Sequence, residues 1–244
     1  MKAIILAAGR GQRLSQVHQG PKCLLHFNGR SLLERHLKNL NENGVGEITI
    51  VVGYEKEKII SALPATNDYT IRLVVNPRYE LGSIVSLETA TETLVSGEEI
   101  ILMDADVLYD SRMIEILISS ENPNCALLDR AFIDGEEPVK ICLDRDKIVH
   151  FGKTIPNDTK YDKIGESVGF FKFSASMAIR LAENVKRHCS HHSGIEPHEK
   201  ILGELFLRHQ ESFSVEDVTG LPWIEIDFPE DTIRAEKEIL PQIE

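Results

Sequence analysis

The chain has 244 residues, 42% of them hydrophobic and 27% charged, which is typical of a globular protein with a sizeable core. A net charge of −12 argues against general nucleic-acid binding, which requires a basic face. There is no signal peptide and no apolar stretch long enough to span a membrane, so we expect a cytoplasmic protein that does not insert into one. The four widely spaced cysteines include no C-x-x-C pair and favour reduced thiols over a zinc site or a disulfide framework.

The first half of the chain alternates strand and helix patterns. Its first apolar run is short and suits a strand that is buried on both faces. Alternating strands and helices imply a parallel sheet, in which ligands bind beyond the carboxyl ends of the strands. The predicted strands are 3–8, 47–52, 71–76 and 99–103, and the predicted helices are 31–43, 56–63 and 83–94, the last with Ser83 as its N-cap.

The second half has a different character. Segments 125–129, 139–143 and 147–150 have hairpin spacing, with a turn at 144–146. The loop 188–198 carries four histidines and has no assigned use. The remaining predicted elements are strands 168–173 and 223–227 and helices 174–188, 199–208 and 229–240.

Glycines and cations follow the first predicted strand. Gly9 and Gly11 allow a sharp turn that exposes backbone N–H groups, as in phosphate-binding loops. Arg10, Arg13 and Lys22 place positive charge around this turn. The loop lacks the Gly-Lys-Ser/Thr of a Walker A motif and the third glycine of a dinucleotide fingerprint. We interpret it as a triphosphate-binding loop; the alternative is an ordinary strand-to-helix turn with solvated cations.

Two pairs of carboxylates lie at strand ends. Asp104 and Asp106 are two residues apart, so their side chains point the same way if the strand continues. Glu225 and Asp227 repeat this spacing near the end of the chain. Carboxylates from two strands, completed by phosphate oxygens and water, are ligands that Mg²⁺ prefers. Each pair alone has the alternative of a surface turn or helix cap, whereas Asp106 and Asp227 together favour a metal site.

The stretch from Leu6 to Leu14, followed by Pro21 and Lys22, resembles the N-terminal signature of nucleotidyltransferases that join a nucleoside triphosphate to a phosphorylated sugar or alcohol. Residues 76–87 and the late Glu-Ile-Asp resemble the branch that includes the phosphocholine, inositol-phosphate and phosphonate cytidylyltransferases. The resemblance implies a three-layer α/β/α Rossmann-like fold, similar to the GT-A fold, with a mixed, mainly parallel sheet. It implies one domain over 1–244, with a nucleotide-binding half at 1–110 and an acceptor-binding lobe with a closing strand and helix at 111–244.

The resemblance also implies roles for individual residues. The catalytic set is Lys22, Arg13, Asp106 and Asp227, of which Asp106 and Asp227 hold Mg²⁺. The nucleotide-binding set is Leu6, Ala7, Ala8, Gly9, Gly11, Arg13, Lys22, Asn76, Gly82, Ser83 and Asp104. The acceptor-binding set is Asp129, Lys140, Lys153, Glu166, Gly169 and Glu225.

The expected reaction is Mg²⁺-dependent transfer of CMP from CTP to a small phosphorylated or phosphonylated acceptor, with release of pyrophosphate. Lys140 and Lys153 would hold the phosphoryl group of the acceptor, and Glu166 or Asp129 its distal polar end. The alternatives are a sugar-1-phosphate nucleotidyltransferase using UTP, dTTP or GTP, a non-catalytic nucleotide sensor, and a glycosyltransferase. No motif indicates a catalytic histidine, a cysteine nucleophile or a Ser/His/Asp triad. No nucleic-acid partner is expected, a homodimer is compatible with the sequence, and the acceptor stays open.

Overall fold

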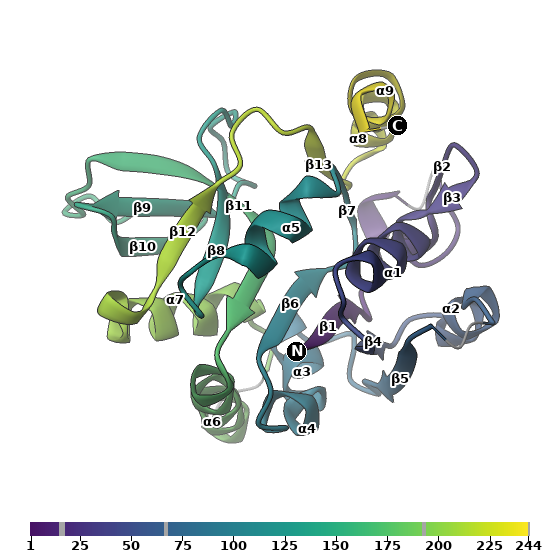
Figure 1. Cartoon of the computed structure of the whole chain (residues 1–244), viewed down its shortest axis with the longest axis horizontal. Helices are drawn as coiled ribbons and strands as arrows, with labels where there is room; N and C mark the ends of the chain where they lie inside the picture. The colour runs from purple at the N-terminus through teal and green to yellow at the C-terminus, as the bar shows by residue number, and fades with distance from the viewer. Residues whose placement is uncertain (15–17, 66–67, 192–193, 244) are drawn as a thin grey trace.

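The structure is a computed structural model that describes residues 1–14, 18–65, 68–191 and 194–243. Within these residues nine strands form one mixed sheet, in which β8 and β12 extend beside β11 from a main order of β10-β9-β11-β6-β1-β4-β5 (Figure 1). Its strands are β1 (Lys2–Ala7), β4 (Glu47–Val52), β5 (Thr70–Val75), β6 (Ile100–Asp104), β8 (Cys125–Asp129), β9 (Lys140–Asp144), β10 (Lys147–Gly152), β11 (Lys163–Phe173) and β12 (Ser214–Asp217). Two small sheets pair β2 (His26–Phe27) with β3 (Arg30–Ser31), and β7 (Val107–Tyr109) with β13 (Trp223–Glu225).

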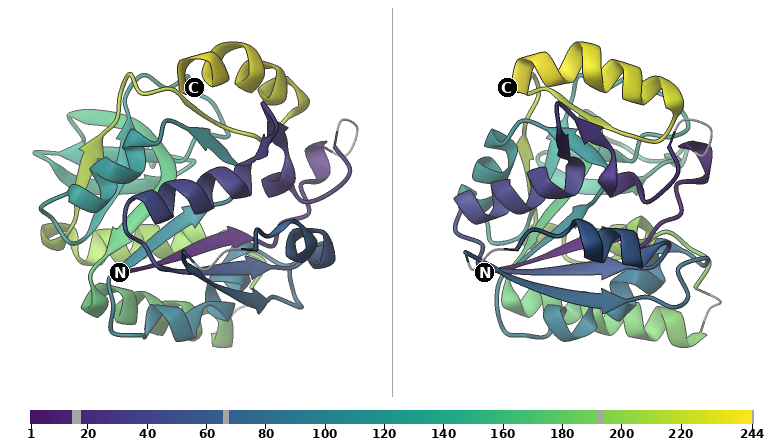
Figure 2. Two further views of the ribbon diagram at one scale, coloured as in Figure 1. Left: turned by 45° about the vertical axis from the view of Figure 1, so that its right-hand side comes forward. Right: turned by 90° about the vertical axis from the view of Figure 1, so that its right-hand side faces the viewer.

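Helices cover both faces of the large sheet (Figure 2). One face carries α1 (Leu32–Glu42), α2 (Lys56–Ala62) and α5 (Arg112–Ser119). The other carries α3 (Ser83–Thr89), α4 (Thr91–Leu94), α6 (Ala175–His191) and α7 (His198–Arg208). This arrangement confirms the predicted three-layer α/β/α fold with a mixed sheet.

The first strand shows why the sheet forms where it does. In β1, Ala3 and Ile5 join the core on the α1 side, whereas Ile4 joins the core on the α3 side. All three are fully buried, because a strand between two helical layers has no solvent-facing side. β1 runs parallel to β4 and β6, and Leu6 lies opposite Asp104. The glycine loop and the Asp104–Asp106 turn therefore leave the sheet at one edge, the carboxyl edge at which ligands were expected to bind.

The long strand β11 joins the two halves of the sheet. It pairs antiparallel with β6, β8 and β9, and its register with β8 shifts between Ser167 and Phe171. Gly169, within this shift, has φ +80°, a conformation that favours glycine. The strand begins at Lys163, five residues before its predicted start at 168, because its first part pairs with β9. The β9–β10 hairpin and its turn confirm the prediction.

Several elements differ from those predicted. The helix expected over 83–94 is interrupted at Ala90 into α3 and α4, and Gly82 rather than Ser83 occupies the N-cap position. The interruption coincides with Thr91, whose hydroxyl donates to the Glu88 carbonyl, a side-chain bond that competes with the helical pattern. Among the described residues, the strands and α-helices that the sequence did not indicate are β2, β3, β7, α5 and β12.

The C-terminal segment packs against β7. It consists of α8 (Pro229–Arg234), a π-helical turn (Ala235–Ile239) and α9 (Leu240–Ile243), where one helix over 229–240 was expected. A third apolar cluster joins this segment to the start of the chain through Leu14, Phe27, Leu32, Leu108, Ile224, Ile226 and Ala235. Among the described residues, no helix is both long and apolar enough to cross a bilayer. All four cysteines are free thiols.

Candidate active site

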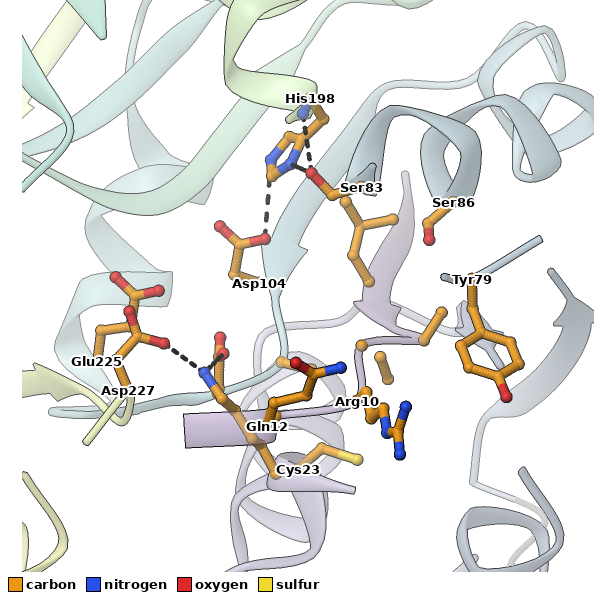
Figure 3. A pocket seen from close by; sticks show the side chains of 18 of the residues that line it. Arg10, Gln12, Cys23, Tyr79, Ser83, Ser86, Asp104, His198, Glu225 and Asp227 are labelled. Atoms are coloured by element: carbon orange, nitrogen blue, oxygen red, sulfur yellow. Dashed lines mark hydrogen bonds and ion pairs between the residues drawn. The ribbon is translucent and has the colours of Figure 1, made fainter. Parts of the chain in front are cut away.

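A cavity of about 760 Å³ opens at the sheet edge where β1 and β6 end (Figure 3). Its volume is in the range of sites for cofactor-sized ligands. Its walls come from the loop after β1, the segment before α3, the turn after β6, the start of α7 and the residues after Trp223. The lining includes nine members of the predicted nucleotide-binding set: Leu6, Ala7, Ala8, Gly9, Gly11, Arg13, Lys22, Ser83 and Asp104.

The loop after β1 is shaped around Lys22. Gly11 has φ +59°, and a Cβ there would lie 2.7 Å from Cγ of Lys22, so only glycine lets this side chain pass. A Cβ at Gly9 would meet nothing within 4 Å, so space remains open beside its backbone. At Gly9 the backbone of the loop is therefore open to the cavity. At Gly11 the lack of a side chain lets the Lys22 side chain extend into the cavity.

Three carboxylates meet at the end of this lysine. Oxygens of Asp106, Glu225 and Asp227 lie within 4.8 Å of one another. The Lys22 Nζ donates to Asp106 Oδ2 at 3.0 Å and to Asp227 Oδ1. The pairing of β13 with β7 produces this meeting, because it places Glu225 opposite Val107, next to Asp106. Three hard oxygen donors from two segments fit a divalent cation such as Mg²⁺.

The charges in this cluster shift the pKa values of Lys22 and of the neighbouring Asp104. Burial alone would lower the pKa of Lys22, but the charges of Asp106 and Asp227 outweigh it and raise that pKa above its usual range. Burial, and then the charges of Asp106 and Glu199, raise the pKa of Asp104 well above its usual value. Burial and the neighbouring acids therefore disfavour the charged form of Asp104, and a positively charged ligand nearby would counteract this effect.

Arg13 lies at the edge of the same cluster. Its guanidinium is 3.1 Å from Glu137 and 3.5 Å from Asp227, and it stacks over the Phe228 ring at 4.8 Å. The side chain is half exposed, so these surface pairs are weak. A triphosphate that reaches this edge would compete with both acids for Arg13.

Two predicted nucleotide-binding residues do not line the cavity. Asn76 is fully buried and donates from Nδ2 to Ser86 Oγ at 3.0 Å, so it positions Ser86, which does line the wall. The N–H of Gly82 donates to the Gly194 carbonyl at 2.7 Å, and a Cβ there would collide with the backbone of Glu196. Gly82 is needed for this close approach between two loops, which the sequence pattern did not reveal.

A second cavity, of about 310 Å³, adjoins the first and shares Glu225 and Asp227 with it. Asp129 and Glu166 of the predicted acceptor set line it. They lie directly opposite each other on β8 and β11, a placement that is destabilising for like charges. Burial and the charge of Asp129 raise the pKa of Glu166 to about 7. Asp129 itself accepts from Trp223 Nε1 at 2.9 Å.

This pKa predicts a pH-dependent stability. The pKa of Glu166 is higher in the folded chain than its ordinary value, so folding favours its protonated form. The ionised form therefore lowers the stability of the fold, and this loss of stability grows as pH rises from about 4.5 to about 7. We expect Glu166→Gln to raise the Tm relative to wild type at pH 8 and much less at pH 5. The effect is on the order of 1–2 kcal/mol, allowing for partial solvent screening. Equal differences in Tm at both pH values would contradict this assignment.

The two predicted acceptor lysines line neither cavity. Lys140 is buried and donates to the carbonyls of Gly135 and Lys153 at 2.6 and 3.0 Å, and Lys153 pairs with Glu137 at 2.8 Å. Both lysines therefore bind groups of the loop between β8 and β9, Lys140 through the Gly135 carbonyl and Lys153 through the Glu137 carboxylate. Their role in binding the acceptor phosphate stays a prediction, and in this structure both lysines have other partners.

Gly169 also lies away from the second cavity. A Cβ on it would be 2.5 Å from Asp104 Oδ2, so the glycine makes room for that carboxylate. Two further residues of the first cavity, His198 and Glu199 at the start of α7, were not indicated by the sequence. The only sequence signal was a His-Glu pair at a predicted helix start. Part of the histidine-rich loop, 192–193, lies outside the described residues.

Comparisons with known proteins place this chain in a family. Residues 3–149 match the MobA-like NTP transferase domain. The chain is 29% identical over 241 residues to a bifunctional IPC transferase and DIPP synthase from Rubrobacter xylanophilus, covering 98% of this chain and 52% of the relative. It is 38% identical over 108 residues to the choline-phosphate cytidylyltransferase of Streptococcus pneumoniae, covering 43% of this chain and 44% of that protein.

A solved structure shows the same fold. The inositol-1-phosphate CTP transferase from T. maritima matches with a TM-score of 0.76 and 24% identity, covering 99% of this chain and 95% of that one. The chain spans about half the length of the bifunctional curated relatives that it matches. The family model covers more than half of the chain, and its residues 3–149 include the glycine loop, Lys22 and Asp106. The chain belongs to the MobA-like NTP transferase domain family.

Proposed function

We propose that the chain is a cytidylyltransferase, which transfers CMP from CTP to a small phosphorylated or phosphonylated acceptor and releases pyrophosphate. The observation that carries the proposal is the position of the Lys22 ammonium, between Asp106 and Asp227 and against the glycine loop. A cation and metal-binding carboxylates at a phosphate loop are the parts that transfer at phosphorus requires. Relatives named for CTP or cytidylyl transfer support the choice of nucleotide.

Each group of the proposed site has a role in this reaction. The backbone at Gly9 and the Arg13 guanidinium would bind the β- and γ-phosphates. The Lys22 ammonium would interact with the α-phosphate. A Mg²⁺ ion held by Asp106 and Asp227 would supply neutralisation of charge on the phosphate oxygens. The acceptor oxygen forms a bond to the α-phosphorus while the bond to the β-phosphate oxygen breaks. An acceptor phosphate is already anionic at neutral pH, so the reaction needs no general base.

The nucleotide preference gives a direct test. We expect kcat/KM for CTP to exceed that for UTP by on the order of 10² or more, because uracil reverses the donor and acceptor positions that a cytosine site must satisfy. Pyrophosphate release is measured for each nucleoside triphosphate with phosphocholine, phosphoethanolamine, 2-aminoethylphosphonate, inositol phosphate and glucose 1-phosphate. Comparable values for UTP and CTP, or a clear preference for glucose 1-phosphate, would show a sugar-nucleotide enzyme. No release with any pair would favour a nucleotide sensor.

A further inference from the structure

One end of the first cavity is a polar chamber built from two distant parts of the chain. Asp104 ends β6, and His198 and Glu199 begin α7. Figure 3 shows Asp104 and His198 at one end of the cavity, with Gln12 and Arg10 of the phosphate loop at the other. The chamber therefore lies away from the place proposed for the triphosphate.

The imidazole of His198 is buried, with 3% of the residue exposed, and stands between two carboxylates. Its Nδ1 is 3.2 Å from Glu199 Oε2 and 3.0 Å from Ser83 Oγ, and its Nε2 is 3.7 Å from Asp104 Oδ1. Within the described part of the chain, His198 Nε2 and Glu199 Oε2 are buried atoms without a hydrogen-bond partner. Both atoms have only the ion-pair contacts just given and no hydrogen bond. Buried polar atoms normally form hydrogen bonds, so two such atoms from residues that line one cavity point to a ligand that would supply donors.

We propose that this chamber binds a primary ammonium group of the acceptor, which makes the acceptor a short aminoalkyl phosphate or phosphonate. This inference rests on the proposed function. An ammonium carries three N–H donors, and Asp104, Glu199 and His198 Nε2 supply three acceptors. A quaternary ammonium has no N–H and would leave the acceptors unpaired. A neutral polyol would leave the charge of both carboxylates without a counter-charge.

The direction of the reaction supports the same end of the cavity. Pyrophosphate leaves on the side of Arg13, so the acceptor attacks from the opposite side of the α-phosphorus. The second cavity is a less suitable binding site for the acceptor, because it is lined by Glu137 and Phe228, which contact Arg13. Gly169, from the segment that resembles an acceptor-binding motif, packs against Asp104 in the chamber.

One of the predicted acceptor carboxylates in the second cavity, Asp129, already has partners. Asp129 accepts from Trp223 Nε1 at 2.9 Å and from the Ala131 N–H at 2.8 Å. The chamber and the second cavity thus make opposite predictions for matched neutral substitutions, Glu199→Gln in the first and Glu166→Gln in the second.

The test compares 2-aminoethylphosphonate with 2-hydroxyethylphosphonate, which replaces the ammonium by a hydroxyl. In wild type we expect kcat/KM to favour the amine over the hydroxyl and over phosphocholine. Glu199→Gln and Asp104→Asn should each reduce the amine-to-hydroxyl ratio by roughly tenfold to a hundredfold, the value of a charged hydrogen bond. Glu204→Gln, an exposed glutamate on the same helix, is the matched control and should leave the ratio unchanged.

Binding gives a second readout that does not need turnover. Calorimetry of both phosphonates with a non-reactive CTP analogue should show the same loss of preference in Glu199→Gln. A ratio that collapses in Glu166→Gln and not in Glu199→Gln would move the ammonium to the second cavity and overturn the inference. An unchanged ratio in both chamber variants would overturn it too. Failure of wild type with every acceptor would instead refute the proposed function.

Discussion

Asp106→Ala and Asp227→Ala are each expected to lower turnover by about 10³-fold while the fold is retained. The reason is geometric: oxygens of Asp106, Glu225 and Asp227 lie within 4.8 Å of one another, and each substitution removes one hard ligand from the proposed cation site. Both side chains are only partly buried, so their removal leaves no large void in the core. The circular dichroism spectrum and Tm should therefore stay close to those of wild type.

A direct measurement of metal binding separates this role from a structural one. Titration of Mg²⁺ or Mn²⁺ in the presence of CTP should show affinity lost by at least tenfold in each variant, in line with loss of a ligand. Asp144→Asn, at the exposed end of β9, is a control that removes a carboxylate far from the cluster. Near wild-type rates at low Mg²⁺ in either alanine variant would refute the metal assignment.

Lys22→Ala is expected to lower kcat by on the order of 10²–10³-fold and to change the KM for nucleotide much less. The Lys22 ammonium is held by Asp106 and Asp227 inside the cavity, so its charge is close to the proposed position of the α-phosphate. Charge builds on that phosphate as the bond to pyrophosphate breaks, and a fixed cation therefore stabilises the transition state more than the bound substrate.

Steady-state kinetics with varied CTP provide the measurement. Lys163→Ala removes an exposed lysine that pairs with Asp146 in the turn between β9 and β10, and it serves as the control. If the KM for CTP rises in Lys22→Ala while kcat is unchanged, Lys22 contributes uniform binding and not stabilisation of the transition state. Lys22→Arg is a useful companion, because it keeps the charge but not the compact ammonium that fits between two carboxylates.

The negative net charge of the chain is consistent with an enzyme that binds phosphorylated substrates, because cations lie within the site. Lys22 and Arg13 both lie in the cavity, but each is paired with carboxylates. When substrate binds, its phosphates would replace the carboxylates as partners of Lys22 and Arg13. A divalent cation would then pair with the carboxylates, so that the charges of the site stay balanced. Composition alone could not show this, because it counts charges without saying which of them lie together.

The sequence by itself determined the parallel half of the fold and the loop that follows β1. The apolar run of β1 is buried on both faces, and this pattern is local, so it is visible without any knowledge of neighbours. The strand ends at Glu47–Val52 and Ile100–Asp104 were predicted within a residue or two for the same reason. Because parallel strands share one carboxyl edge, the meeting of the glycine loop with Asp104 and Asp106 also followed from the pattern.

The tertiary structure decided which side chains complete the site. The contact of Lys22 with Asp227 spans 205 residues of sequence, and that of Ser83 with His198 spans 115. No local pattern encodes such pairs, because they depend on the short β7–β13 pairing and on the docking of the loop before α7 against Gly82. Likewise, the family resemblance assigns Lys140 to the acceptor phosphate, and only the tertiary structure shows that its nearest acceptors are the carbonyls of Gly135 and Lys153.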